Sequence, residues 1–279
     1  MMTFQQALEL ASTKLLASNG NKQNTRLDAQ LLLCHACGIE QTQIIAHPER
    51  PLTGTQLKDF QSILIRRAKG EPLAYITGNK EFWSLDFIVN QDVLIPRPET
   101  ELLVEHALNT IRDKKNPRLL DLGTGSGAIA ISIAKEQKNC EVYASDISPV
   151  ALKVAKQNAS RHAVDITFLQ SDWYRKIIDE KFDVIVCNPP YIAASDPDLE
   201  KHVTKYEPHK ALISNNDGLA DLEIIISNAT KHLIDTGSLI VEHGYKQADS
   251  VQQLFKQNGF KSIRTIQDLA GLNRVTFNH

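Results

Sequence analysis

The spacing of apolar residues changes along this chain of 279 residues, and the change predicts two parts of different fold. In the first part, apolar residues recur every three to four positions, as they do on one face of a helix. This spacing predicts helices at residues 3–16, 25–37, 42–47 and 53–69. Glycine or proline follows three of these stretches, as is typical of helix ends. We therefore expect a small N-terminal helical bundle over residues 1–75.

Short apolar runs replace the helical spacing in the rest of the chain. Residues 79–95 alternate apolar and polar side chains, which predicts a β-hairpin inside a linker at 76–96. Further on, runs typical of strands lie at 118–122, 141–145, 166–170, 183–187, 237–241, 261–267 and 274–278, with helical spacing at 217–233 and 247–257. Strands that alternate with helices indicate an α/β domain with a mostly parallel sheet, and we place it at residues 97–279.

Composition narrows the class of protein but does not identify its chemistry. Hydrophobic residues make up 42% of the chain and charged residues 23%, as in ordinary globular proteins. The net charge of −2, from 31 basic and 33 acidic residues, gives no strong positive field for nucleic acid. No apolar run approaches the length of about 18 residues that spans a membrane, and no secretory leader is recognisable. We expect a cytoplasmic protein.

Cysteine and histidine positions do not predict a metal site. Cys34 and Cys37 have the C-x-x-C spacing of zinc and redox sites, but no second ligand pair at a suitable spacing accompanies them. They end an apolar helical run, so we interpret them as small apolar residues of that helix. The nine histidines follow no metal-ligand pattern.

A glycine-rich segment from Asp121 to Gly127, the glycine loop, joins a predicted strand to a predicted helix. Strand, glycine loop and helix form the first unit of a doubly wound nucleotide-binding fold. An acid ends the next strand, about 20 residues beyond the loop, where it accepts hydrogen bonds from a ribose diol. The cofactor-binding residues predicted here are Asp121, Gly123, Thr124, Gly125, Ser126, Gly127 and Asp146.

Glycine spacing in the loop distinguishes between cofactors. A dinucleotide site has the pattern G-x-G-x-x-G and directs a helix N-terminus at a pyrophosphate. This loop has G-x-G-x-G with Asp121 before it. A negatively charged pyrophosphate gains nothing from an adjacent acid, whereas a cationic ligand does. S-adenosylmethionine carries a sulfonium and an ammonium group, so the pattern favours it over NAD.

The tetrapeptide Asn188-Pro189-Pro190-Tyr191, the NPPY turn, follows the predicted strand at 183–187. Asn188 offers a carbonyl acceptor and an amide donor. The two prolines fix the backbone and leave carbonyls without a local N–H, and Tyr191 adds a flat ring. Such a slot fits a planar group that bears an NH2, as a carboxamide, an adenine and a guanine do. The alternative interpretation is a proline turn that only closes a strand.

Strand order predicts that the two motifs lie together. In a sheet of order 3-2-1-4-5 the first and fourth strands are neighbours, and ligands bind beyond their carboxyl ends. We therefore expect the glycine loop and the NPPY turn to face each other across one crevice. One side would hold a methyl donor, and the other a planar NH2 group.

Further motifs accompany these two, at 70–78, 81–83, 93–101, 146–148, 172–173, 206–208, 217–219 and 242–247. With them, the chain from about residue 66 onward resembles the bacterial release-factor glutamine N5-methyltransferase family. The segment Ile95 to Glu101 separates this family from amino-methyltransferases that share only the tetrapeptide. One departure is Asn273, where the family usually has an acid before Arg274. We expect this position to lie near the last strand, away from the crevice.

The resemblance implies a class I S-adenosylmethionine-dependent methyltransferase fold, which is Rossmann-like with a mostly parallel seven-stranded sheet and an antiparallel pair at one edge. It implies methylation of the glutamine of the Gly-Gly-Gln motif in class I peptide chain release factors, which supports translation termination and leaves S-adenosylhomocysteine. It assigns substrate binding to Asn188, Pro189, Pro190 and Tyr191. It assigns cofactor binding to the glycine loop, Asp146, Trp173 and Asn188, although Trp173 could equally be a core residue.

Chemistry suggests how such a site would act. The lone pair of a glutamine amide is delocalised, and no side chain deprotonates an amide near pH 7. Orientation is the alternative: the Asn188 side-chain oxygen and the Pro189 carbonyl would accept the two amide hydrogens, and Tyr191 would pack on the carboxamide. Asn188, Pro189 and Tyr191 are therefore the predicted catalytic residues. Arg97 and Glu99 are expected to shape the crevice.

Three other functions stay open on the sequence alone. A ribosomal-protein glutamine methyltransferase would use the same chemistry, and an adenine-N6 or guanine-N2 nucleic-acid methyltransferase would use the same slot. A binding module without turnover is the third. The acidic balance of charge argues against a nucleic-acid substrate, and we expect class I release factors as partners, with the N-terminal helical bundle as their docking domain.

Overall fold

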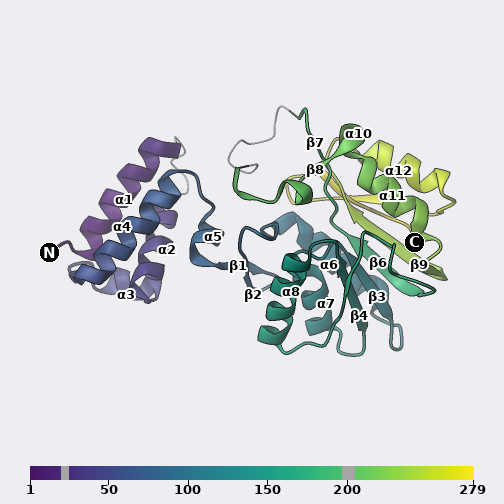
Figure 1. The fold of residues 1–279 in the computed structure, drawn as a ribbon, viewed down its shortest axis with the longest axis horizontal. Helices are drawn as coiled ribbons and strands as arrows, with labels where there is room; N and C mark the ends of the chain where they lie inside the picture. Colours follow the sequence, from purple (N-terminus) through teal and green to yellow (C-terminus); the bar gives the residue numbers. More distant parts are fainter. Residues whose placement is uncertain (20–24, 197–204) are drawn as a thin grey trace. The chain divides into compact units, whose positions relative to one another are not determined.

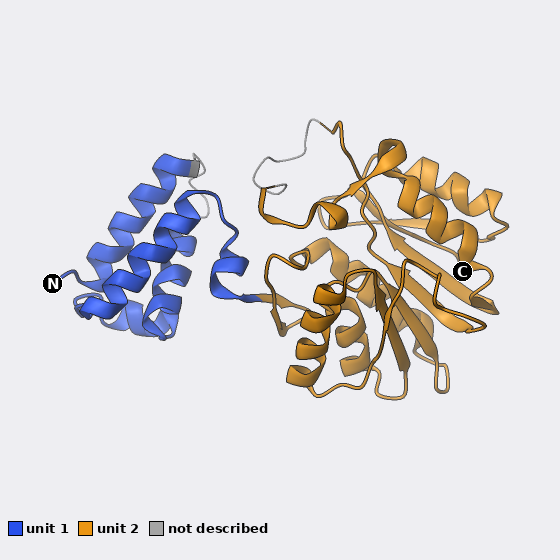
Figure 2. Cartoon of the chain, in the orientation of Figure 1, with its two compact units in different colours: residues 1–79 blue, residues 80–279 orange. Residues whose placement is uncertain are grey.

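The computed structural model describes residues 1–19, 25–196 and 205–279. The chain forms two compact units, residues 1–79 and residues 80–279 (Figures 1 and 2). Most of the segment that we predicted as a linker, 80–96, therefore belongs to the second unit. Among the described residues, no helix is both long and apolar enough to cross a membrane.

The first unit is helical throughout. Its apolar faces enclose a core that contains Phe4, Leu32 and Phe60, all without solvent exposure. Helix α4 (Gly54–Ala68) begins at a capping box. The Thr53 hydroxyl accepts from the Gln56 backbone N–H, and the Gln56 side chain accepts from the Thr53 N–H. The helices are α1 (Phe4–Asn19), α2 (Thr25–Cys37), α3 (Gln41–Ala46), α4 (Gly54–Ala68) and α5 (Leu73–Thr77).

The second unit is an α/β domain built on a seven-stranded sheet, preceded by a small hairpin, β1 (Asn79–Phe82) and β2 (Leu85–Ile88). Along the sheet the order is β10-β11-β9-β6-β3-β4-β5. Five strands are parallel, and β11 runs antiparallel to β9 and β10. This confirms the predicted order and edge pair. The strands are β3 (Arg118–Leu122), β4 (Glu141–Asp146), β5 (Thr167–Gln170), β6 (Phe182–Cys187), β9 (Leu233–Glu242), β10 (Arg264–Gln267) and β11 (Asn273–Phe277).

Helices cover both faces of this sheet, with α6, α7 and α8 grouped on one side and α11 and α12 on the other (Figure 1). Because both faces are covered, the central strands β3 and β6 are buried along almost their whole length. The helices are α6 (Glu101–Ile111), α7 (Ala128–Glu136), α8 (Pro149–His162), α11 (Ala220–Ala229) and α12 (Ala248–Gln257).

Short elements lie near the carboxyl ends of the strands, and the sequence did not predict them. A 3-10 turn, η1 (Pro98–Thr100), leads into α6, and a second one is η2 (His209–Ala211). Two-residue strands β7 (Ile192–Ala193) and β8 (Ile213–Ser214) pair in parallel beside α10 (Asn215–Gly218). These pieces surround the NPPY turn.

The predicted helix at 217–233 and strand at 237–241 were wrong in their bounds. Asn216 and Asp217 have φ of 52° and 51°, which breaks the chain before α11 begins at Ala220. The buried face of α11 ends at Ala229, and β9 begins at Leu233, which pairs with Phe182. Leu233 follows Ala229 by four residues and so continues the helical spacing, and periodicity therefore did not reveal that the helix ends before it.

Candidate active site

The glycine loop lies at the carboxyl ends of β3 and β4. The backbone N–H groups of Gly123 and Thr124 both donate to the Ser145 carbonyl, at 2.9 Å. Gly123, Gly125 and Gly127 have φ of 71°, 55° and 83°, a left-handed conformation that glycine adopts without strain. At Gly127 a Cβ atom would lie 2.8 Å from the Ile131 side chain, whereas at Gly125 it would meet open space. The middle of the loop is therefore accessible to a ligand.

Asp121, the fourth residue of β3, is fully buried under this loop. Its Oδ2 accepts from the Thr124 hydroxyl at 2.6 Å, while its Oδ1 has no hydrogen-bond partner in the described part of the chain. Burial raises the pKa of this carboxyl to about 7, against the opposing effect of the Thr124 hydrogen bond. A buried acceptor that lacks a donor fits a ligand with a positive charge and N–H groups.

Asp146, the last residue of β4, is tied to the glycine loop. Its Oδ2 accepts from the Gly125 backbone N–H at 2.9 Å, and its Oδ1 accepts from the Ser148 N–H at 2.8 Å. Burial raises its pKa, and these backbone donors oppose the rise. The carboxylate thus fixes the loop as well as lying where a ribose was predicted.

Trp173 forms a wall beside the loop. A Cβ atom on Gly123 would lie 3.4 Å from the Trp173 ring, so ring and loop are in contact. The indole N–H donates to Asp221 Oδ1 at 3.2 Å, which fixes the plane of the ring. These contacts place Trp173 next to the predicted cofactor residues, and its other atoms pack on the core.

The Asn188 side chain, at the start of the NPPY turn, has a defined orientation. Its Nδ2 donates to the Thr100 hydroxyl oxygen at 2.9 Å, across 88 residues of sequence. No hydrogen bond to its Oδ1 is found among the described residues, so this oxygen is available as an acceptor. Asn188 and Pro189 both line the cavity described below.

Tyr191 is held at its hydroxyl and at its backbone carbonyl. Its hydroxyl donates to Glu242 Oε1 at 3.0 Å, and its backbone carbonyl accepts from Gln247 Nε2 at 3.0 Å. Gln247 also donates to the Asp217 carbonyl and accepts from the Gly244 N–H. At Gly218 a Cβ atom would lie 2.1 Å from the Tyr191 carbonyl oxygen, so only glycine fits there. The end of the NPPY turn is thereby locked in place.

Glu242, the last residue of β9, is 1% exposed, and its Oε2 has no hydrogen-bond partner in the described chain. Burial raises its pKa to about 7, while the nearby Thr100 and Tyr191 hydroxyls and the charge of Arg274 lower it. Burial, followed by the charge of Glu242, also raises the pKa of Tyr191. The Tyr191 hydroxyl therefore stays protonated and donates.

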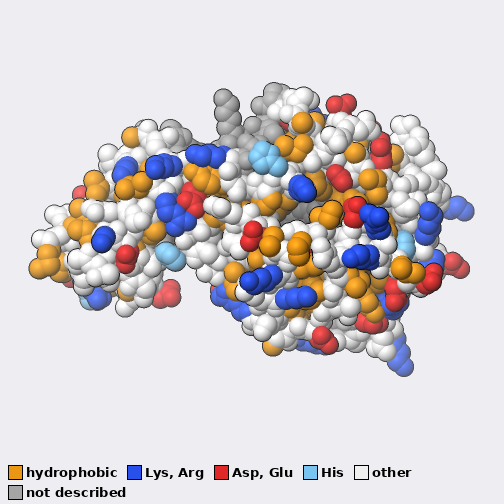
Figure 3. All heavy atoms as spheres, viewed as in Figure 1, with side chains coloured by type: hydrophobic (Ala, Val, Ile, Leu, Met, Phe, Trp, Pro, Cys, Tyr) orange, Lys and Arg blue, Asp and Glu red, His pale blue; other side chains and the backbone are white. Residues whose placement is uncertain are grey.

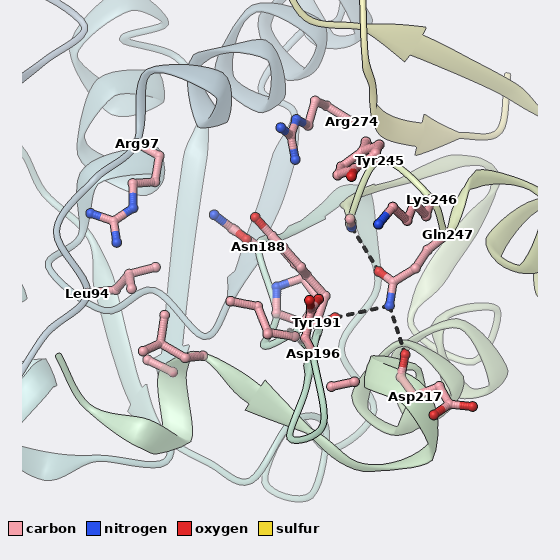
Figure 4. Close-up of a pocket in the computed structure, with 16 residues that line it drawn as sticks. Leu94, Arg97, Asn188, Tyr191, Asp196, Asp217, Tyr245, Lys246, Gln247 and Arg274 are labelled. Carbon is pink, nitrogen blue, oxygen red and sulfur yellow. Dashed lines mark hydrogen bonds between the residues drawn. The ribbon is translucent and has the colours of Figure 1, made fainter. Parts of the chain in front are cut away.

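A cavity of about 450 Å³ opens beside the NPPY turn (Figure 4). Both arginines of its lining form ion pairs: Arg97 with Glu207 at 2.5 Å, and Arg274 with Asp268 at 2.8 Å. The full lining is Leu94, Arg97, Asn188, Pro189, Tyr191, Ile192, Ala193, Asp196, Ala211, Leu212, Asp217, Gly244, Tyr245, Lys246, Gln247 and Arg274.

Arg274, at the start of the last strand, lines the cavity, whereas Asn273 before it is not among the lining residues. Strand β11 pairs with β9, and Val275 lies opposite Glu242, so the residue before it reaches the same edge of the sheet. Arg97 lines the cavity as predicted, whereas Glu99 does not. The negative charge of Glu99 instead raises the pKa of Glu242 and the pKa of Arg274.

The sheet brings the two predicted motifs to one edge. Strands β3 and β6 are parallel neighbours, with Leu122 opposite Cys187, so the glycine loop and the NPPY turn leave the sheet side by side. Three of the residues that hold this site have no role that the sequence predicts. Thr100, Glu242 and Gln247 lie in quoted motifs, but no local pattern signals contacts across such long stretches of chain.

Comparison with known proteins agrees with this architecture. Residues 98–206 match the "Methyltransferase small domain" model, and residues 6–78 match the "PrmC N-terminal domain" model. The release factor glutamine methyltransferase of Salmonella typhimurium is 43% identical over 276 residues, which cover 99% of this chain and 98% of the relative. The enzyme of the same name from Escherichia coli is 41% identical, with the same coverage.

Solved structures share the fold of the second unit. A methyltransferase from Pyrococcus furiosus aligns with a TM-score of 0.51 and 17% identity, covering 78% of this chain and 96% of that one. An S-adenosylmethionine-dependent methyltransferase from Agrobacterium tumefaciens aligns with a TM-score of 0.50 and 15% identity, covering 71% and 68%. At this identity the likeness shows the fold alone. The predicted fold class is confirmed.

Proposed function

The chain belongs to the release factor glutamine methyltransferase family, and from this premise we propose that it methylates the side-chain amide nitrogen of a release-factor glutamine. The target is the glutamine of the Gly-Gly-Gln motif in class I peptide chain release factors. One observation carries the proposal: Asn188 donates to Thr100 and leaves its Oδ1 free to accept at the cavity wall.

S-adenosylmethionine is the cofactor, and the residues around the glycine loop fit it. Asp121 offers a buried oxygen without a donor, which suits the ammonium group. The open backbone at Gly125 and the carboxylate of Asp146 suit the ribose, and the ring of Trp173 suits the adenine. When bound, the cofactor supplies an electrophilic methyl group on a sulfonium.

The NPPY turn supplies alignment rather than basicity. Asn188 Oδ1 and the Pro189 carbonyl accept the two hydrogens of the glutamine amide, which fixes its nitrogen and directs the lone pair toward the glycine loop. The rigid prolines and the anchored Tyr191 ring keep this geometry. Orientation of two bound reactants can lower a barrier by about 7–11 kcal/mol. The nitrogen becomes acidic once it carries the methyl group, so the proton leaves afterwards.

Release factors as partners, and a cytoplasmic location with them, are part of the proposal. On the face shown in Figure 3, Lys and Arg side chains are interspersed with Asp and Glu. This face shows no continuous basic patch of the kind that binds nucleic acid. The helical unit has its own core and matches a domain model of this family, which supports a docking role.

A substrate panel tests the proposal. The enzyme and labelled S-adenosylmethionine are incubated in separate reactions with a class I release factor, with ribosomal proteins, with DNA and with RNA. We expect label in the release factor, removed when its Gly-Gly-Gln glutamine is replaced by glutamate. Label in a ribosomal protein or a nucleic acid, with none in the release factor, would overturn the assignment.

A further inference from the structure

The segment from Glu242 to Gln247, with the pattern Glu-x-Gly-x-x-Gln, leads from the end of β9 to α12. Gln247 occupies the N-cap position of α12, where a side chain commonly accepts from the first N–H groups of the helix. The Gln247 side chain makes no such hydrogen bond. It turns to other segments of the chain, so capping of α12 does not explain it.

The partners of the Gln247 amide fix its orientation (Figure 4). Its Nε2 donates to the Tyr191 carbonyl at 3.0 Å and to the Asp217 carbonyl at 3.1 Å. Its Oε1 accepts from the Gly244 backbone N–H at 2.8 Å. A carbonyl can only accept and a backbone N–H can only donate, so the reverse orientation of the amide would break all three bonds.

The backbone around Gln247 is anchored to the sheet. The His243 N–H donates to the Arg274 carbonyl at 2.9 Å, and the buried His243 ring lies 2.8 Å from Thr276 Oγ1. A Cβ atom at Gly244 would lie 3.0 Å from Gln247 Oε1, so the lack of a side chain there lets the amide approach the backbone closely. Gln247 therefore acts from a fixed base on β9 and β11.

The first residue of the segment holds the other end of the same tyrosine. Glu242 Oε1 accepts from the Tyr191 hydroxyl at 3.0 Å, and Glu242 is 1% exposed, so water does not readily replace this bond. Six consecutive residues thus contact Tyr191 at its carbonyl, through Gln247, and at its hydroxyl, through Glu242. The backbone and the ring of Tyr191 are held at the same time.

We propose that Gln247 and Glu242 are positioning residues that clamp Tyr191 at both ends and so hold its ring against the substrate carboxamide. The proposal rests on the function proposed above, in which this ring packs on the glutamine amide. Tyr191 lines the cavity. A tyrosine released at either end would move relative to the carboxamide plane, and the amide nitrogen would lose part of its alignment.

Gln247→Glu tests the clamp at the carbonyl with little change of shape. A glutamate is ionised at about pH 8, so it keeps an acceptor for the Gly244 N–H but offers no donor to the carbonyls of residues 191 and 217. We expect kcat to fall by about tenfold to a hundredfold, as the loss of two hydrogen bonds gives. The S-adenosylmethionine Kd should stay within about threefold, because the glycine loop is intact.

Gln253→Glu is the matched control, because it adds the same charge at an exposed position of α12 and should keep the wild-type kcat. If Gln247→Glu does not fold, two other variants decide. Gln247→Met keeps the length of the side chain and removes its hydrogen bonds without adding charge, and Tyr191→Phe keeps the ring and removes the hydroxyl. Each should lower kcat by about tenfold. A wild-type kcat in any variant at residue 247 or 191 would overturn the proposal.

A fluorine signal separates this positioning role from a merely structural one. The full-length enzyme is labelled with 3-fluorotyrosine and bound to S-adenosylhomocysteine without release factor, and the Tyr191 resonance is assigned by its loss in Tyr191→Phe. We expect Gln247→Glu and Gln247→Met to shift this resonance, while that of Tyr143 on β4 stays in place. An unshifted Tyr191 resonance would overturn the inference, whereas failure of the wild-type enzyme to methylate a release factor would overturn only the proposed function.

Discussion

At the scale of single residues, the site consists of groups whose hydrogen bonds are already assigned before substrate binds. Asn188 gives its NH2 group to Thr100, and Tyr191 gives its hydroxyl to Glu242. What stays available is an amide oxygen and a proline carbonyl at the cavity wall. In the function proposed here, these two acceptors receive the two hydrogens of a primary amide, and orientation takes the place of a general base.

Asn188→Ala should abolish methyl transfer, because the acceptor that orients the glutamine nitrogen is lost. The S-adenosylmethionine Kd should change by less than about tenfold, since the glycine loop is intact. Steady-state kinetics and calorimetric titration of the cofactor measure the two effects. Asn109→Ala, at an exposed asparagine of α6, is the control. Normal turnover in Asn188→Ala would refute the role of the slot.

Asp146→Ala should raise the S-adenosylmethionine Kd by more than tenfold. It removes charge-assisted hydrogen bonds of about 1.5–3 kcal/mol each and also releases the Gly125 N–H that the carboxylate holds. Calorimetric titration gives the Kd, with Asp165→Ala, at an exposed aspartate, as the control. An unaltered Kd would mean that the ribose is held elsewhere.

At the scale of elements, a tight packing of short segments holds the NPPY turn from behind. The break before α11 places Gly218, with φ of 84°, directly against the Tyr191 carbonyl. Gln247, just before α12, closes the same corner with hydrogen bonds to residues 191 and 217. The geometry of the site thus depends on segments that carry no chemistry of their own.

Gly218→Ala should be more destabilising than the left-handed backbone alone requires. The conformation costs an alanine about 1–2 kcal/mol, and here the new Cβ would also collide with a backbone carbonyl. Gly259→Ala is the matched control, because Gly259 has φ of 82° and open space around it. Urea unfolding and kcat are measured for both. Equal losses of stability, with full activity in Gly218→Ala, would contradict this explanation.

The elements that the sequence predicted are those with a clear periodicity or a recognisable motif. The strands β3, β4 and β6, the glycine loop and the NPPY turn have such marks, and their meeting follows from the strand order. Thr100 and Glu242 have no such mark, because their roles arise from contacts with residues 88 and 51 positions away. The bounds of α11 and β9 were missed because Leu233, the first residue of β9, follows Ala229 at helical spacing, so periodicity does not show where the helix ends.

At the scale of the whole molecule, the active-site edge of the sheet carries two buried carboxylates at a cost in stability. Asp121 and Glu242 both have a pKa of about 7 in the folded chain, against ordinary values of 3.8 and 4.5. Both lie at the carboxyl ends of strands, where the ligands are expected. Burial of a charge without full pairing is unfavourable for folding. At Asp121, the ammonium group of bound S-adenosylmethionine would offset this cost.

The free energy of unfolding should therefore depend on pH through these two groups. Between about pH 4.5 and 7 the folded state binds more protons than the unfolded state, so their contribution falls as pH rises and levels off above 7. His106, whose pKa burial lowers to about 4, contributes the opposite slope. The test is therefore the difference between wild type and Asp121→Asn with Glu242→Gln, measured by urea unfolding. A difference independent of pH would contradict the raised pKa values.

The decisive measurement is a structure of the enzyme with S-adenosylhomocysteine and a Gly-Gly-Gln peptide. We expect the glutamine amide nitrogen to lie within hydrogen-bonding distance of Asn188 Oδ1 and the Pro189 carbonyl. The cofactor sulfur should face that nitrogen from the glycine loop. A glutamine bound outside the NPPY turn, or a cofactor bound away from the loop, would contradict it.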